Sequence, residues 1–285
     1  MFKICMAQLH RTFRCARFYI AAVVGCIMQI ISILPLARFA KSVGAPLCVF
    51  EGFVYLNCDT FIFSATVLAA VIMISDIPFS SGNEIFPLLR ISRRKWLFGK
   101  CLYILIVCFI FYGIVFSSGA LCVLDQVYVK NLWSKPFQML SRDVGGILCE
   151  RYGLHMPYID MVSISPAWAF VNCMGLSVAY VFSLSLVIFA CNMMFKKGIS
   201  FFLGFLFHVA NYMFTAIMPG TLYKKLAFLA NSQLIYHHIR GGPTEGTYPS
   251  LGISWLMYIV FITVLLLVLG QLVKRYDFKM SIEKK

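Results

Sequence analysis

The chain has 285 residues, of which 61% are hydrophobic and only 13% are charged. Soluble domains are about 45–50% apolar and about 25% charged, so this composition excludes a soluble enzyme, a disordered chain and a disulfide-rich secreted scaffold. It predicts an all-α polytopic membrane protein. The net charge of +14 raises the question of nucleic-acid binding, which the position of the charges along the chain answers.

Six segments are apolar enough to cross a membrane, which takes about 20 residues of helix. They are separated by polar connections, and their runs are continuous rather than alternating, which excludes an outer-membrane barrel. The sequence therefore predicts one domain over residues 1–285 with six transmembrane helices. The predicted spans are, in chain order, about 18–36, 57–76, 101–123, 167–195, 199–219 and 251–273.

The basic residues predict which side of the membrane each connection occupies. Sixteen of the 25 Lys and Arg residues fall in the two terminal segments and the second and fourth connections. Because Lys and Arg are enriched in cytoplasmic loops, these segments and both termini are predicted to be cytoplasmic. The excess charge is then anchoring charge in a bacterial cytoplasmic membrane, and nucleic acid is not an expected partner.

The two ends of the chain are basic segments outside the spans. Residues 1–17 mix apolar side chains with Lys3, Arg11, Arg14 and Arg17, which predicts an amphipathic helix in the cytoplasmic interface. Such a helix either anchors the topology alone or also touches a cytoplasmic partner, and the two roles are compatible. Residues 274–285 are predicted to be a cytoplasmic tail.

The connection between spans two and three is the most informative stretch of the sequence. A turn cluster at 80–83 precedes Glu84, whose charge suits the N-terminal end of a helix. A short apolar patch follows, and then a group of cations. The expected exposed helix comprises Glu84, Ile85, Phe86, Leu88, Leu89, Arg90, Arg93 and Arg94. Its apolar side chains need lipid, the bundle or a partner protein to cover them.

Few polar residues fall within the spans. Asn172, Asn192, His208 and Asn211 either form hydrogen bonds between helices or line a transport path. Outside the spans, Leu222–Leu229 predicts a re-entrant or surface helix. His237 and His238 are adjacent, which disfavours a shared metal because neighbouring residues point to different helix faces.

The sequence contains no recognisable catalytic, metal-binding or nucleotide-binding motif. The eleven cysteines form no CxxC pair, which favours free cysteines packed among helices, although pairing among Cys48, Cys58 and Cys149 stays open. No phosphate-binding GxxxxGK[ST] motif occurs. The sequence thus predicts no enzyme, and no metal or cofactor on this chain.

Taken together, these features resemble a permease subunit of the ABC-2 family of bacterial exporters. The resemblance is carried by the basic N-terminal helix, by six spans with both ends inside, and by Glu84, the run Leu88-Leu89-Arg90-Ile91-Ser92-Arg93 and Gly99-Lys100. It covers the whole chain in topology and about 25 residues in motif. It implies that the helix between spans two and three is a coupling helix docked on an ATPase subunit, and that short re-entrant helices lie between spans five and six.

The resemblance also implies the partners. Two ATPase copies, which carry ATP and Mg, would work with this chain and with a second copy or a paralogous permease. The substrate would be a peptide, a lipid or another hydrophobic compound. Two alternatives stay open: a membrane immunity or binding protein that needs no ATPase, and an intramembrane enzyme. The shortage of acids and histidines within the spans counts against the enzyme.

Overall fold

The computed structural model describes residues 2–75, 92–143, 146–154, 163–195, 197–218, 221–238 and 248–275. Within these residues, five helices are long and apolar enough to cross a membrane, which makes the chain a helical membrane protein. They are α2 (Ala16–Val43), α6 (Arg93–Cys122), α9 (Pro166–Met194), α10 (Lys197–Tyr212) with its continuation η4 (Met213–Ile217), and α13 (Leu251–Arg275).

The second predicted span is occupied by a shorter helix. The helix α4 runs over Thr60–Ile74 and has 15 residues, which is about 22 Å at 1.5 Å per residue. A hydrocarbon core about 30 Å thick needs more than that. Asp59 begins α4, because its Oδ1 accepts hydrogen bonds from the backbone N–H groups of Phe61 and Ile62, at 2.8 and 3.1 Å.

Short elements fill the connections between the long helices. The prediction of an all-helical chain omitted a two-stranded parallel ladder, in which Leu47 pairs with Val127 and Cys48 with Tyr128. The short elements are α1 (Phe2–Thr12), β1 (Leu47–Cys48), α3 (Glu51–Leu56), η2 (Leu124–Gln126), β2 (Val127–Tyr128), α7 (Lys135–Ser141), α8 (Ile147–Tyr152), α11 (Thr221–Leu226), α12 (Phe228–Ser232) and η5 (Leu234–Tyr236).

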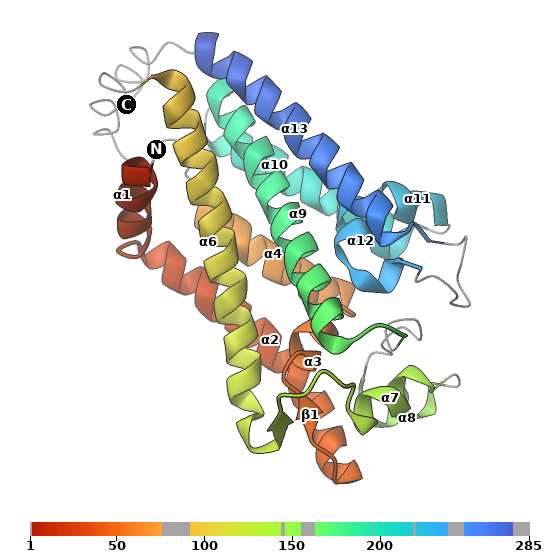
Figure 1. Cartoon of the computed structure of the whole chain (residues 1–285). Coiled ribbons are helices and arrows are strands. Elements are labelled where there is room, and N and C mark those ends of the chain that lie inside the picture. The colour runs from red at the N-terminus through yellow and green to blue at the C-terminus, as the bar shows by residue number, and fades with distance from the viewer. Residues whose placement is uncertain are drawn as a thin grey trace.

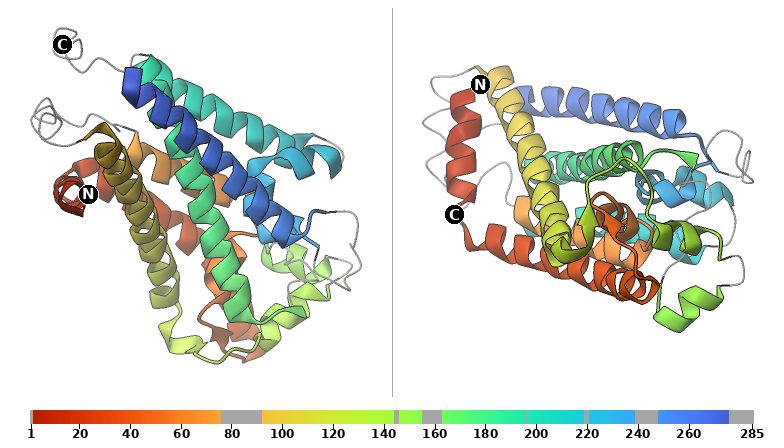
Figure 2. Two further views of the ribbon diagram at one scale, coloured as in Figure 1. Left: turned by 45° about the horizontal axis from the view of Figure 1, so that its top comes forward. Right: turned by 60° about the horizontal axis from the view of Figure 1, so that its bottom comes forward.

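The helix α9 runs through the middle of the bundle (Figures 1 and 2). It packs against α3, α4, α6, α10, α12 and α13, and its side chains are buried along almost its whole length. Three serines on it are fully buried, and each hydroxyl donates to the carbonyl four residues earlier: Ser177, Ser183 and Ser185. A central helix can therefore hold polar side chains without leaving their hydroxyls unpaired.

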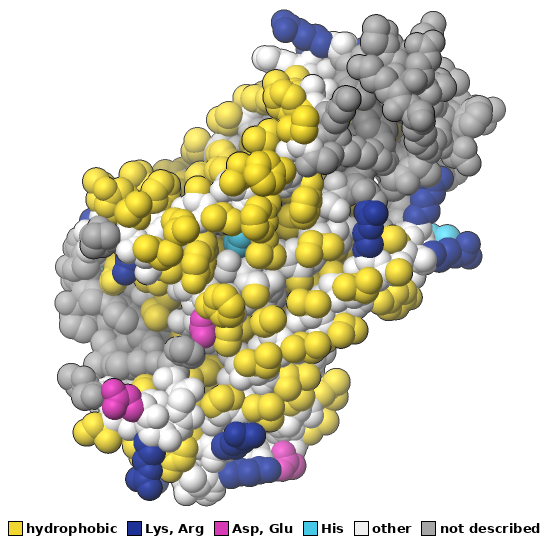
Figure 3. Space-filling model, turned by 180° about the vertical axis from the view of Figure 1, so that it is seen from behind, with side chains coloured by type: hydrophobic (Ala, Val, Ile, Leu, Met, Phe, Trp, Pro, Cys, Tyr) yellow, Lys and Arg dark blue, Asp and Glu magenta, His cyan; other side chains and the backbone are white. Residues whose placement is uncertain are grey.

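The outer helices show the opposite pattern. The most apolar window of α13 is 17% buried, against 83% for α9. Seen from behind, hydrophobic side chains cover a broad band of the surface, and the visible Lys and Arg side chains lie mostly around its margins (Figure 3). This arrangement suits a bundle whose flank meets lipid.

The two ends of the bundle differ in their elements. At one end, which we call the basic end, α1 packs beside α6, and the start of α6 meets the end of α13 (Figure 1). Its exposed cations are Arg11, Arg14, Arg17, Arg93, Arg94, Lys95, Lys274 and Arg275. The other end, the loop end, carries the two strands, α3, α7 and α8.

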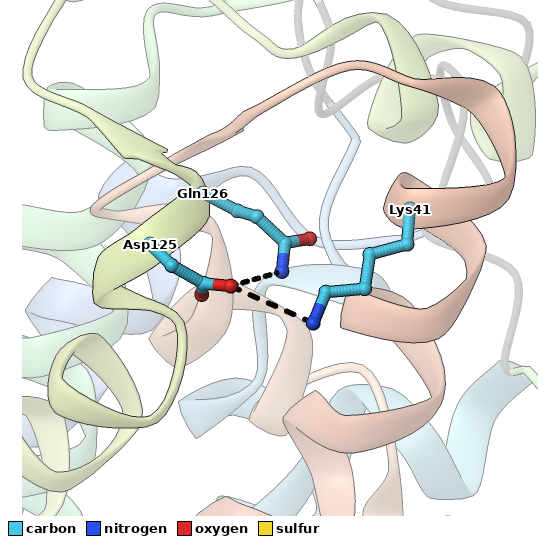
Figure 4. Close-up of polar contacts among 3 residues, drawn as sticks. All are labelled: Lys41, Asp125 and Gln126. Carbon is cyan, nitrogen blue, oxygen red and sulfur yellow. Dashed lines mark hydrogen bonds and ion pairs between the residues drawn. The ribbon is translucent and has the colours of Figure 1, made fainter.

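At the loop end, the C-terminal part of α2 meets the turn that follows α6. Gly44 ends α2 with a positive φ of 65°, a conformation that glycine adopts without strain. Lys41 Nζ lies 3.5 Å from Asp125 Oδ2, and Gln126 Nε2 donates to the same carboxylate oxygen at 3.0 Å (Figure 4). Lys41 and Asp125 are exposed, so this pair marks a contact between segments rather than a source of stability.

Candidate functional site

The predicted coupling residues divide into two groups. Glu84, Ile85, Phe86, Leu88, Leu89 and Arg90 lie outside the described residues. Arg93 and Arg94 begin α6 at the basic end, and both are exposed. The structure therefore describes the chain up to Ser75 and again from Ser92, so it places Arg93 and Arg94 but not the other predicted coupling residues.

Both flanks of this segment are tied to the ends of other helices. On the α4 side, Asn192 Nδ2 near the end of α9 donates to the Ser75 carbonyl at 3.4 Å. On the α6 side, Arg93 Nη1 donates to the carbonyls of Val273 and Lys274 at the end of α13. These last carbonyls of a helix have no partner within it, and a cation is favourable there.

The N-terminal helix packs against α6 at the same end. Cys5 and Leu9 are buried, and the hydroxyls of Thr12 and Tyr103 lie 2.5 Å apart. Arg11 and Arg14, on other faces of this region, are exposed. One side of α1 is thus fixed to the bundle while its cations stay accessible at the basic end.

His208 joins three helices in the interior. Its Nε2 lies 2.8 Å from Ser64 Oγ on α4, and its Nδ1 lies 2.9 Å from Tyr180 Oη on α9. The imidazole is 1% exposed. Both ring nitrogens therefore have hydroxyl partners on neighbouring helices, which is the arrangement of an interhelical hydrogen bond.

The three asparagines predicted to line a path are also buried and bonded. Asn211 Oδ1 accepts the backbone N–H of Phe228 at 2.7 Å. Asn172 Oδ1 accepts the indole N–H of Trp255 at 3.1 Å. Asn172 and Asn192 are 20 residues apart on α9, which is about 30 Å along the helix axis. The four predicted residues thus do not converge on one site, although His208 and Asn211 are neighbours on α10.

A polar cluster that the sequence analysis did not predict lies between α12 and α13. His237 Nδ1–H donates to the Gln233 carbonyl at 2.9 Å, and its Nε2 lies 2.8 Å from Ser254 Oγ. The Ser254 hydroxyl donates to Asn231 Oδ1 at 2.6 Å. Burial lowers the pKa of His237 to about 4, so the imidazole is neutral at pH 7 and its Nε2 is an acceptor. The Ser254 hydroxyl proton is then shared between two acceptors, His237 Nε2 and Asn231 Oδ1.

The same cluster continues toward α3 and α9. Gln233 Nε2 donates to the Asn57 carbonyl at 2.9 Å, and the Ser177 hydroxyl lies 3.2 Å from Asn57 Oδ1. All three of these side chains are fully buried. The run Asn231-Ser232-Gln233 within an apolar stretch was the signal in the sequence for this cluster. The polar cluster fixes the segment between α10 and α13 to the rest of the bundle.

A buried carboxyl group fixes the loop end. Glu51 is fully buried and belongs to the short helix α3 rather than to one of the long helices. Its two oxygens accept the backbone N–H groups of Cys48 and Ser134, at 2.9 and 2.5 Å. Burial raises the pKa of Glu51 to about 7, although both N–H groups favour the carboxylate. Glu51 thereby connects α3 to the start of α7.

The cysteines are free. None of the eleven takes part in a disulfide, so Cys48, Cys58 and Cys149 are not paired. Among the described residues, no group of three His, Cys, Asp or Glu side chains could hold a metal ion.

Comparison with known proteins adds no assignment. No family model, no curated protein and no solved structure matches this chain.

Proposed function

We propose that the chain is the permease subunit of an ATP-driven exporter of the ABC-2 type in a bacterial cytoplasmic membrane. The observation that carries this proposal is the attachment of both flanks of residues 76–91. Ser75 is bonded to the end of α9, and Arg93 is bonded to the end of α13. A partner that displaced this segment would act directly on the central helix and on an outer helix.

Two further observations support the proposal. The helix α1 lies against α6 at the basic end, where a cytoplasmic partner would dock beside exposed cations. Between α10 and α13, the short elements α12 and η5 fold back into the bundle and are tied to it by His237, Asn231 and Gln233. This order of elements agrees with the resemblance drawn from the sequence.

In the proposed mechanism, two ATPase subunits bind ATP and Mg and close upon each other at the cytoplasmic side. Glu84–Arg94 moves with them, and the helices of two permease halves rearrange to open a path outward. The halves are two copies of this chain or this chain and a paralogue. The cargo is a peptide, a lipid or another hydrophobic compound, as the resemblance drawn from the sequence implies.

The test is purification of the affinity-tagged chain from its native membrane, followed by an assay for a bound ATPase. We expect an ATPase carrying GxxxxGK[ST] to purify with it. Glu84→Arg should abolish this association while membrane insertion stays normal, because the coupling helix loses its acidic N-terminus. Glu150→Arg is the matched control: Glu150 is exposed at the loop end, and the same charge change there should have no effect.

Two outcomes would contradict the proposal. If no ATPase purifies with the chain under mild detergent, the alternative of an immunity or binding protein takes its place. If an ATPase is present but Glu84→Arg and Glu150→Arg bind it equally well, the coupling role of Glu84 is wrong.

A further inference from the structure

The helix α13 is fixed at its two ends and packs less closely between them. Its buried side chains are Ser254 and Tyr258 near the start and Leu269 and Val273 near the end. Between Tyr258 and Leu269, every residue is exposed or only half-buried. The fully buried side chains of this helix therefore lie in two places about 11 residues, or about 16 Å, apart, and between them Ile262, Leu265 and Leu266 make partly buried apolar contacts with the core.

Polar contacts at the start of α13 lead to the segment between α10 and α13. Ser254 bonds with His237 and Asn231. The Tyr258 hydroxyl donates to the Phe228 carbonyl at 2.6 Å. Displacement of this end of α13 would thus break or move the contacts that position α12 and η5.

At the other end, the polar contact comes from the first residue of α6. Arg93 Nη1 donates to the carbonyls of Val273, at 3.4 Å, and Lys274. The guanidinium is suited to this contact, because it can bridge two carbonyls of the final helical turn and its charge matches the C-terminal end of the helix dipole.

We propose that α13 is a rod that transmits displacement of the start of α6 to the segment of α11, α12 and η5, with Arg93 as its positioning residue. A helix of 25 residues is about 37 Å long, so it reaches from the basic end to the His237 cluster without a break. Between its two ends the described contacts are apolar, and the side-chain hydrogen bond there, from Thr263 to the Ile259 carbonyl, stays within the helix, so α13 can shift or tilt as a unit without breaking a hydrogen bond to another helix. This inference rests on the proposed function for its purpose, since the motion would originate at the coupling segment.

The test of the rod is amide hydrogen exchange, followed by mass spectrometry, on the full chain in lipid nanodiscs without an ATPase. Arg93→Ala removes the donor. We expect exchange in the peptide covering 269–275 to become about tenfold faster, as for loss of one charge-assisted hydrogen bond. We also expect exchange in the peptide covering 228–238, at the far end of α13, to become about threefold faster.

Arg94→Ala is the matched control, because Arg94 is an exposed cation in the same turn of α6 and its side chain forms no hydrogen bond with another described residue. It should change neither peptide. Arg93→Lys retains the charge and one donor, so its exchange rates should lie between those of Arg93→Ala and those of the unaltered chain. This variant also keeps the test decisive if Arg93→Ala does not fold. Faster exchange at 269–275 alone, no change in either peptide, or equal effects of Arg93→Ala and Arg94→Ala would each overturn the proposal.

A second measurement separates this inference from the proposed function. With the ATPase bound, Arg93→Ala should lower the amount of transport per ATP hydrolysed while the ATPase remains associated, and Arg94→Ala should leave this ratio unchanged. An unchanged ratio in Arg93→Ala would overturn the transmission role. If no ATPase is found, the proposed function fails, but the exchange experiment still decides whether Arg93 and the α12–η5 segment are connected through α13.

Discussion

Gly119 on α6 allows a close approach of α2, and the substitution Gly119→Ala tests how tightly these helices are packed. A Cβ atom at position 119 would lie 2.6 Å from Nε2 of Gln29 and 2.9 Å from its Cγ. Both distances are shorter than real Cβ contacts allow. Gln29 would have to move, although it is fully buried and its Nε2 donates to the Gly52 carbonyl at 2.9 Å.

The cost follows from these two effects. Overpacking a buried contact costs about 1–3 kcal/mol, and leaving the buried Gly52 carbonyl without its donor costs about 1–3 kcal/mol more. Since one movement of Gln29 causes both, we expect Gly119→Ala to lower the free energy of unfolding by about 2–4 kcal/mol. Gly113→Ala on the same helix is the control, because no atom lies within 4 Å of the added Cβ.

The assay is reversible unfolding in mixed micelles, followed by tryptophan fluorescence. A double-mutant cycle sharpens it. In a Gln29→Ala background, the space near Gly119 is empty, so Gly119→Ala should cost less than about 0.5 kcal/mol there. Equal stabilities of Gly119→Ala and Gly113→Ala would refute the close approach. An undiminished cost in the Gln29→Ala background would show that Gln29 is not the obstacle.

Three further predictions concern buried polar groups. The pKa of Glu51 is raised from 4.5 to about 7, so its contribution to stability is present below pH 4.5 and is lost as the pH rises to 7; a Glu51→Gln variant whose melting temperature has the same pH slope as the unaltered chain would contradict this. The pKa of His237 is lowered from 6.5 to about 4, so its contribution to stability is present above pH 6.5 and is lost as the pH falls to 4. The effects of Glu51 and His237 on stability therefore oppose each other between pH 4.5 and 6.5. In His237→Gln only the effect of Glu51 remains, so the stability of this variant should fall as the pH rises from 4.5 to 6.5. Tyr258→Phe removes the hydrogen bond to the Phe228 carbonyl and should cost about 1 kcal/mol in the same unfolding assay, with no cost meaning that water replaces the hydroxyl.

The sequence predicted the long helices because lipid imposes a length and a composition on them. It placed their ends less well: α6 begins at Arg93, eight residues before the predicted start of that span, because a helix continues through the polar interface where hydropathy gives no signal. The helix α3 and the ladder of Leu47 with Val127 were missed because such short elements have no periodicity to detect.

Partners across the bundle were beyond the reach of the sequence for a different reason. His208 stood out as a rare ionisable residue in a span, but Ser64 and Tyr180, which bond it, are ordinary residues 144 and 28 positions away. Which helix faces meet is decided by packing of whole surfaces. Likewise, His237 was noted for its neighbour His238, while its contact across the bundle is with Ser254 on α13.

These contacts bear on where a transport path would form under the proposed function. A path through one chain would have to break interhelical bonds such as that of His208 with Tyr180 or Asn172 with Trp255, each worth about 0.6–2 kcal/mol. Among the described residues, the outward faces of α10 and α13 carry no such bonds, and most of their exposed side chains are apolar, for example Phe202 and Ile259. Separating such faces from lipid or from another permease half costs no buried hydrogen bond. A path between two halves, lined by α10 and α13, therefore requires less disruption of the described structure than a path through the His208 cluster, and it would leave Arg93 and α13 positioned to move one of its walls.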